Sequence, residues 1–560
     1  MDHFASRQGR LCVPPRAVRY ASIVLACLAA LGGPGSAVAG TSVDVLTFKA
    51  SGPSPFLPDC NGVDQSGFLY PNAEVEPFVA NNPLNPLNMV SVWQQDRWTD
   101  GGAQGLGTGV TFDGGVTWTA MYLPFTRCAG GNAANGGDFE RGSDPWVRFS
   151  PNGVVHEMVL ALSFNAVGDA PVSAMLASRS TDGGMTWGPT MTLEADTGEY
   201  FNDKNSITAD PTDSNYVYAT WDRLSSIPGD GAGPTMLARS VDNGASWEAT
   251  RIVYDPGTTA QTIGNRIEVL PDGTLVDLFT LLDFEAQTAT LNVIRSTDKG
   301  DTWSAPVFIA DMLAIGASDP ETGAPIRDGA ELAQMAISRQ GKISVVWQDA
   351  RFSGGVRDGV ALSESTDGGM TWSAPVQINH DPLVQAFTPS VHARDDGTFG
   401  VSYYDLRHNT DDRTTLPTDL WLTRSGDGMT WRENRVTATF DLDFAPRAGG
   451  LFLGDYQGIV SIGPIFMPVF VKTNADTDNR NDVFSHINLL RHKPLGSLEV
   501  ERQVAREEAA LPVTIARGTG QATFEATPAL RAAAWRSVER TLRARVPDWD
   551  ARQAARRVAH

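Results

Sequence analysis

A short segment that ends in tryptophan recurs six times between residues 111 and 431, and this repeat constrains the fold more than any other feature. It reads Ser-Thr-Asp-Gly-Gly-Met-Thr-Trp at residues 180–187 and again at 365–372, and the sixth copy lacks one residue. Its aspartates follow one another at intervals of 69, 60, 56, 69 and 60 residues, at Asp113, Asp182, Asp242, Asp298, Asp367 and Asp427. A repeat of this length indicates an array of similar supersecondary units.

Each copy, called an octet below, predicts a tight turn that leads into a strand. The aspartate carboxylate accepts hydrogen bonds from backbone N–H groups just ahead of it, and the glycine supplies a positive φ. The tryptophan restarts a strand and packs its ring between neighbouring units. We therefore expect a structural role for the six octet aspartates.

The residues before each octet alternate in the way that half-buried strands do. In the fifth repeat we expect strands at 334–338, 342–347 and 360–364 before the octet, and a fourth strand at 376–378 after it. A final strand set without an octet follows at 457–461, 466–471 and 482–487. Ser42–Phe48 is predicted to supply its fourth strand, because such closure would hide the sheet edges.

The octets resemble the Asp box, or BNR repeat, of the sialidase superfamily, which marks the turn between the third and fourth strands of a propeller blade. The resemblance covers about residues 70–490. It implies an all-β, sialidase-like β-propeller of four-stranded blades, with the boxes on the face away from the active site. We predict seven blades, from six octet-bearing units plus the final strand set; six, the number in sialidases of that family, is the alternative.

The two ends of the chain differ from this central part, which we assign to residues 40–495. Residues 1–39 are predicted to be a signal peptide, with four arginines, an apolar run at 21–31 and a cleavage site after Ala39. Cys27 leaves a lipoprotein as the alternative. Residues 496–560 are rich in Ala and Arg, and Leu530–Arg545 shows helical spacing. This helical extension either packs on the propeller rim or binds a partner.

Cysteine and charge indicate the compartment and exclude some partners. Removal of the leader leaves Cys60 and Cys128, and an even count in an oxidising compartment favours one disulfide. The net charge of −21 argues against nucleic-acid binding, which needs a basic surface. We expect a monomer, secreted or periplasmic, without a membrane span or cofactor; its acidic surface is compatible with structural calcium.

The direction of the strands predicts which face carries chemistry. Loops between the second and third strands lie opposite the octets, and four of them contain an aspartate followed closely by an arginine. The pairs are Asp96-Arg97, Asp222-Arg223, Asp349 with Arg351, and Asp405 with Arg407. Such a pair either braces one blade on the next or presents the guanidinium to an anionic sugar.

The starts of the innermost strands place further polar residues at the same channel mouth. They are Glu74, Glu76, Arg141, Asp144, Asp203, Lys204, Arg266, Arg327, Asp328, Glu331, Asp455 and Tyr456. Glycosidic chemistry uses a carboxylic acid that protonates the leaving oxygen and a second group that acts at the anomeric carbon. In the family that the octets resemble, an Asp is the general acid/base, and the resemblance implies this role for Asp144, with Asp203 as the second choice.

The resemblance assigns further roles. In the family, three arginines bind the substrate carboxylate and a Tyr–Glu couple is the nucleophile. Tyr456 with Glu331 matches the couple, and the residues expected to bind substrate are Arg97, Arg141, Arg223, Arg266, Arg327, Arg351, Arg407 and Lys204, of which Arg266, Arg327 and Arg407 would form the clamp. The family's Arg-Ile-Pro motif is absent, because the first blade begins Glu-Val-Glu-Pro-Phe at 74–78.

Three functions are compatible with these residues. The first is a secreted exo-glycosidase of sialidase type acting on acidic sugars. The second is a propeller polysaccharide lyase, in which His408 or Tyr456 would remove a proton from a uronate. The third is a propeller that binds carbohydrate without catalysis.

Overall fold

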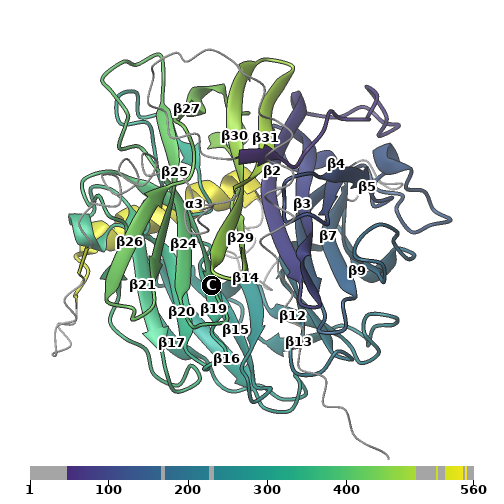
Figure 1. The fold of residues 1–560 in the computed structure, drawn as a ribbon, viewed down its shortest axis with the longest axis horizontal. Coiled ribbons are helices and arrows are strands. Elements are labelled where there is room, and N and C mark those ends of the chain that lie inside the picture. Colours follow the sequence, from purple (N-terminus) through teal and green to yellow (C-terminus); the bar gives the residue numbers. More distant parts are fainter. Residues whose placement is uncertain are drawn as a thin grey trace, which may run out of the picture. The chain divides into compact units, whose positions relative to one another are not determined.

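The structure is a computed structural model that describes residues 47–164, 171–225, 227, 232–486, 513–514, 524–545 and 549–550. The predicted signal peptide, Cys27 and residues 42–46 of the predicted closing strand lie outside the described residues. The strands build an all-β propeller, and one helix lies in the C-terminal extension (Figure 1).

The first three four-stranded sets follow one another along the chain, each with antiparallel neighbours. Set 1 contains β2 (Leu69–Asn82), β3 (Asn85–Trp98), β4 (Ala103–Thr111) and β5 (Thr119–Tyr122). Set 2 contains β6 (Arg141–Phe149), β7 (Val155–Ser163), β8 (Val172–Ser180) and β9 (Met191–Thr197). Set 3 contains β10 (Tyr200–Ala209), β11 (Val217–Ser225), β12 (Thr235–Ser240) and β13 (Arg251–Tyr254).

The next three sets repeat this order. Set 4 contains β14 (Ala260–Val269), β15 (Leu275–Asp283), β16 (Thr288–Ser296) and β17 (Val307–Asp311). Set 5 contains β19 (Gln334–Ile337), β20 (Ile343–Asp349), β21 (Gly359–Ser365) and β22 (Val376–Gln377). Set 6 contains β23 (Ala386–Ala393), β24 (Phe399–Asp405), β25 (Pro417–Ser425) and β26 (Thr430–Arg435), with β27 (Phe440–Asp441) and β32 (Val513–Thr514) at its edges.

The last set combines the two ends of the propeller. It contains β29 (Gly458–Ile462), β30 (Ile465–Asp476), β31 (Asn479–His486) and the N-terminal β1 (Thr47–Lys49). β1 pairs antiparallel with β31, so that Thr47 faces His486 and Lys49 faces Phe484. The described part of the chain thus contains seven sets of four strands, of which the last set and sets 1 and 2 join in one twelve-stranded sheet. Seven blades stay a prediction.

The octets form the expected turns between the third and fourth strands of sets 1 to 6. In the second copy, Asp182 Oδ1 accepts from the Ser180 hydroxyl at 2.7 Å and from the Thr186 N–H at 2.9 Å, and Oδ2 accepts from the Thr186 hydroxyl at 2.6 Å. The indole N–H of Trp187 donates to the Gly184 carbonyl at 2.9 Å. Each aspartate therefore holds its own turn together.

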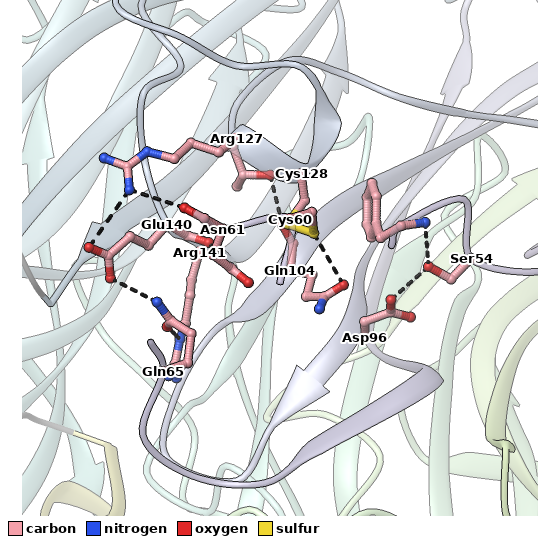
Figure 2. Close-up of a disulfide and its surroundings, with 12 residues drawn as sticks. Ser54, Cys60, Asn61, Gln65, Asp96, Gln104, Arg127, Cys128, Glu140 and Arg141 are labelled. Carbon is pink, nitrogen blue, oxygen red and sulfur yellow. Dashed lines mark hydrogen bonds and ion pairs between the residues drawn. A yellow bond between two sulfur atoms is a disulfide. The ribbon is translucent and has the colours of Figure 1, made fainter. Parts of the chain in front are cut away.

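The predicted disulfide between Cys60 and Cys128 is confirmed (Figure 2). It links the segment before β2 to a short 3-10 helix, η1 (Arg127–Ala129), which follows β5. Arg127 reinforces the link, because it donates to the Asn61 carbonyl at 3.2 Å and forms an ion pair with Asp138 at 2.7 Å. The bond fixes residues that lie next to the loops of the first two sets.

The C-terminal helix α3 (Pro528–Arg545) covers the stretch whose spacing predicted a helix. Its buried side chains Leu530 and Ala534 belong to the same apolar cluster as Leu313 and Ala350. The ring centroids of Trp535 and Phe284 are 5.5 Å apart. The extension therefore packs on loops of sets 4 and 5, as the first of its two predicted roles requires.

Candidate functional site

A bulge recurs in the innermost strands and turns charged side chains toward one another. The strand register shifts at Glu76, Asp144 and Lys204, whose φ angles are 54°, 49° and 43°. Gly264 and Thr388 occupy the equivalent bulges in sets 4 and 6, with φ of 70° and 49°. A bulge re-aims a side chain, and a positive φ in a residue other than glycine stores strain of a kind concentrated at functional sites.

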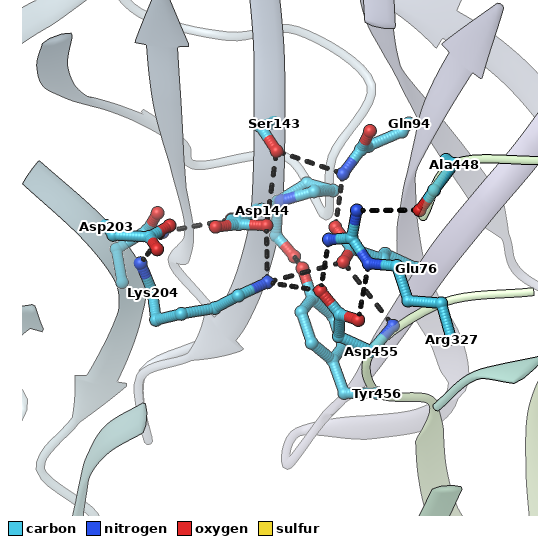
Figure 3. Close-up of polar contacts among 12 residues, drawn as sticks. Glu76, Gln94, Ser143, Asp144, Asp203, Lys204, Arg327, Ala448, Asp455 and Tyr456 are labelled. Atoms are coloured by element: carbon cyan, nitrogen blue, oxygen red, sulfur yellow. Dashed lines mark hydrogen bonds and ion pairs between the residues drawn. The ribbon is translucent and has the colours of Figure 1, made fainter. Parts of the chain in front are cut away.

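Lys204 lies at the centre of a buried ionic cluster (Figure 3). Its Nζ lies 3.0 Å from Asp144 Oδ1, 2.9 Å from Asp455 Oδ2 and 3.4 Å from Glu76 Oε1. All four side chains are at most 4% exposed. Sets 1, 2 and 3 and the segment before set 7 each contribute one ionisable side chain, so the cluster depends on the closed arrangement of the sets.

Two long connections cover this cluster. They pair as a short parallel ladder of β18 (Ile326–Arg327) and β28 (Leu451–Phe452). Arg327 binds Asp455 with two hydrogen bonds, from Nε at 2.9 Å and from NH2 at 2.6 Å. A Cβ at Gly329 would lie 2.0 Å from the Asp455 carbonyl oxygen, so only glycine permits this close approach.

The carboxyl groups of Glu76 and Asp144 lie within hydrogen-bonding reach of each other, and their pKa values are shifted in opposite directions. Burial raises the pKa of Glu76 to about 8, with Lys204 opposing the shift and Asp144 adding to it. Burial would also raise the pKa of Asp144, but Lys204 and the bond with Glu76 hold it below its usual value. At neutral pH Glu76 therefore keeps its proton and Asp144 is ionised, a division typical of acid–base pairs.

A pocket opens beside the cluster. Among its lining residues are Arg97, Ser143, Asp144, Asp203, Lys204 and Arg327. The carboxyl groups of Asp144 and Asp203 point toward each other in Figure 3. Three carboxyl groups, including that of Asp100, and three cations thus line one cavity. The sequence placed five of these six residues at one channel mouth: Asp144, Asp203, Lys204, Arg97 and Arg327.

Arg97 differs from the other arginines predicted to bind substrate. Its side chain is buried, NH1 donates to Gln94 Oε1 at 2.9 Å, and Nε has no hydrogen-bond partner. Burial, and then the nearby Arg327, lower the pKa of Arg97 to about 10. Gln94 also donates to Ser143 Oγ at 3.1 Å and to Glu76. Sequence reasoning missed Gln94 and Ser143, which carry no distinguishing motif.

Tyr456 lies beside the cluster, where its hydroxyl binds a backbone carbonyl and the carboxylates of the cluster act on it electrostatically. The hydroxyl donates to the Pro145 carbonyl at 3.1 Å, and the ring lies 5.2 Å from that of Trp146. Burial, and then Glu76 and the other carboxylates, raise the pKa of Tyr456 well above its usual range. Glu331, its predicted base, is buried on the connection before β19, where its carbonyl accepts from Thr280. Neither contact activates a tyrosinate.

The three arginines predicted to form a carboxylate clamp bind separate carboxylates. Arg266 binds Glu268, whereas Arg327 binds Asp455. Arg407 pairs with Asp405 and Glu433, and its guanidinium lies 3.5 Å from the centroid of the Trp421 ring. The structure therefore does not bring the clamp together.

The remaining predicted arginines have structural partners. Arg351 pairs with Asp349 of its own loop and also donates to the Asp311 carbonyl of set 4. It therefore braces one set on the next, which is the first of the two roles expected for the Asp–Arg loops. Arg223 pairs with Asp196 instead of the adjacent aspartate, and Arg141 pairs with Asp100.

Within the described ranges, no group of three or more His, Cys, Asp or Glu residues is arranged to hold a metal ion.

Comparisons with known proteins concern the fold alone. No protein-family model matches the chain, and no curated protein matches it in sequence. Among solved structures, the Hadza microbial sialidase is 18% identical over 71% of this chain and 76% of its own, with a TM-score of 0.42. The intramolecular trans-sialidase of Ruminococcus gnavus is 13% identical over 65% and 97%, with a TM-score of 0.40. The α-L-arabinanase of Penicillium chrysogenum is 12% identical over 61% and 92%, with a TM-score of 0.37.

No helix among the described residues is long and apolar enough to cross a membrane.

Proposed function

We propose that this protein is a secreted glycoside hydrolase that acts on an acidic sugar in the pocket beside Lys204. The observation that carries the proposal is the state of Arg97. This buried guanidinium lines the same cavity as Asp144 and Asp203, yet among the described residues it forms no direct ion pair with a carboxylate, and its Nε has no hydrogen-bond partner. Only carboxyl groups that form no direct ion pair with Arg97, those of Glu76, Asp455 and Asp144, offset this buried charge. A buried charge that is incompletely compensated is costly, and the carboxylate of an acidic sugar would compensate it with a charge-assisted hydrogen bond.

Asp144 supplies the ionised carboxylate that hydrolysis needs. Lys204 holds it in that state at a distance of 3.0 Å, and the hydrogen bond with Glu76 also keeps its pKa low. In this position Asp144 either attacks the anomeric carbon or takes a proton from the attacking water. This role replaces the acid/base role that the sequence suggested for Asp144.

Asp203 faces Asp144 and is the proton donor in this proposal. Its Oδ1 accepts from the Lys204 backbone N–H at 3.0 Å, which fixes the carboxyl group at the pocket wall. Its proton passes to the glycosidic oxygen as the bond to the anomeric carbon breaks, and water completes the hydrolysis. Tyr456 and Glu331 then have no catalytic part and serve to hold the last set in place.

The proposal is tested by incubating the mature protein with chromogenic glycosides and polysaccharides of acidic and neutral sugars, with mass analysis of the products. We expect release of a free acidic monosaccharide. Asp144→Asn should lower turnover by about a hundredfold or more, by analogy with the loss of acid–base help. Asp349→Asn is the matched control, because Asp349 is also a buried carboxylate paired with a cation, here Arg351, but lies outside the pocket.

Two results would contradict the proposal. An unsaturated product that absorbs ultraviolet light would identify a lyase. Binding of a glycan without turnover, unchanged in Asp144→Asn, would identify a carbohydrate-binding propeller.

A further inference from the structure

The central channel contains a second pocket on the octet side of the propeller. Its walls come from the innermost strands β2, β6, β14, β19, β23 and β29, and the residues that matter here are Phe78, Arg148, Arg266, Glu268, Ser390 and His392. A further cavity beside Tyr456 contacts both Lys204 and Arg266, but the second pocket and the pocket beside Lys204 share no lining residue.

A layer of aromatic rings lies between them. Phe78 stacks on Trp146 with ring centroids 3.7 Å apart, and Trp146 meets Tyr456 at 5.2 Å. Lys204 contacts this layer from the side of the ionic cluster, with its Nζ 5.7 Å from the Tyr456 centroid. On the other side, the Arg266 guanidinium lies 5.4 Å from the centroid of Trp146.

The second pocket carries more positive than negative charge. Arg148 and Arg266 share one carboxylate oxygen, Glu268 Oε1, which Arg266 NH2 reaches at 2.9 Å. The remaining partner of Arg266 is the neutral Gln334. Nε of Arg148 is buried and has no partner. One carboxylate thus pairs with two guanidinium groups, and the pocket keeps an excess of positive charge.

Neighbouring polar groups complete the cavity wall. His392 Nε2 lies 3.0 Å from the Ser461 hydroxyl. Burial, and then the charges of Arg148 and Arg266, lower the pKa of His392 to about 3, so its ring is neutral and offers one N–H. The side chains of Arg148 and Glu268 are 24% and 18% exposed, so solvent reaches the site.

We propose that this octet-side pocket is an anion-binding site, which takes a small oxyanion such as phosphate or a carboxylate. A guanidinium binds such groups with parallel, charge-assisted hydrogen bonds. An oxyanion here would balance the second guanidinium charge, which Glu268 alone leaves uncompensated. The inference is independent of any hydrolysis in the other pocket.

Isothermal titration of the full mature chain with inorganic phosphate, at neutral pH and 0.15 M NaCl, tests the site. We expect saturable binding with one phosphate per chain, and Arg148→Gln should weaken it about tenfold or more, since it removes a charge-assisted hydrogen bond. Arg239→Gln is the matched control, because Arg239 pairs with Glu248 and Asp301 outside the pocket. A parallel titration with acetate shows whether the site prefers phosphate or a carboxylate.

A second variant and a second readout keep the result decisive if Arg148→Gln folds poorly. Arg266→Lys retains the charge but loses the planar pair of donors, so it should also weaken phosphate binding severalfold. Phosphate should raise the melting temperature of the wild type and of Arg239→Gln more than that of either pocket variant. Absence of saturable binding, or an equal loss in Arg239→Gln, would overturn the proposal.

Discussion

The buried carboxyl group of Glu157 should make the stability of the protein depend on pH by an amount that can be calculated. Glu157 lies on β7 and is fully buried. Its Oε2 accepts from the Thr108 hydroxyl of β4 at 2.9 Å, and its Oε1 has no partner. Burial raises the pKa of Glu157 from 4.5 to about 8, and the bond from Thr108 opposes the shift only in part. The folded protein thus holds this carboxyl group in its neutral form.

The sign of the pH dependence follows from this shift. Below pH 4.5 the group is protonated in both the folded and the unfolded chain, so its contribution to stability is complete. As the pH rises from 4.5 to 8 the unfolded chain ionises first, and the free energy of unfolding falls by about 1.4 kcal/mol per pH unit. The loss from this single group is on the order of 4–5 kcal/mol at pH 8.

Glu157→Gln removes the titration while keeping the shape and a hydrogen-bonding partner for Thr108. Urea unfolding followed by tryptophan fluorescence, at several values between pH 4.5 and 8.5, should show the variant gaining stability relative to wild type as the pH rises. Glu285→Gln, at an exposed turn, controls for the loss of one negative charge. A difference between Glu157→Gln and wild type that does not change with pH would refute the reasoning.

Three further outcomes are expected. Asp182→Ala or Asp367→Ala should each lower the free energy of unfolding by about 1–2 kcal/mol, because turn hydrogen bonds are lost, and should leave turnover unchanged. A loss of activity at a constant melting temperature would instead indicate that the octets take part in catalysis. Thiol titration of the denatured, unreduced mature protein should find no free thiol at Cys60 or Cys128, and reduction should destabilise the fold by about 4 kcal/mol in the chain-entropy model. Tyr456→Phe should keep nearly full turnover and lose about 1 kcal/mol of stability, measured by urea unfolding, because its hydroxyl only binds a carbonyl; a large loss of turnover would return it to the mechanism.

The sequence was sufficient for those parts of the fold that depend on local chemistry. An Asp-x-Gly turn is determined by its own side-chain bonds, so the octets predicted the ends of the third strands and, with alternation, most of the strands. The disulfide followed from a count of cysteines and a compartment. The helix at Leu530–Arg545 followed from spacing, although its contact with Phe284 did not, because that contact joins distant segments.

The candidate site was predicted in composition but not in arrangement. Which arginine lacks a carboxylate depends on side chains far apart in the sequence, so four similar Asp–Arg loops gave no reason to prefer Arg97. Three bulge residues are followed by proline in the sequence, at Glu76-Pro77, Asp144-Pro145 and Thr388-Pro389. Proline cannot donate a hydrogen bond to a strand ladder and is found at bulges, so these pairs were a weak sequence signal for them. Nothing local indicated that Tyr456 would turn its hydroxyl to a backbone carbonyl.

The most direct test of the proposed hydrolase compares two buried arginines of equivalent loops. The measurement is kcat/KM for an acidic glycoside and for its neutral amide, in wild type, Arg97→Gln and Arg351→Gln. Recognition of the sugar carboxylate by Arg97 predicts a loss of about tenfold or more in Arg97→Gln for the acidic glycoside alone, with Arg351→Gln close to wild type. Equal losses for both substrates, or the same loss in both variants, would contradict the account.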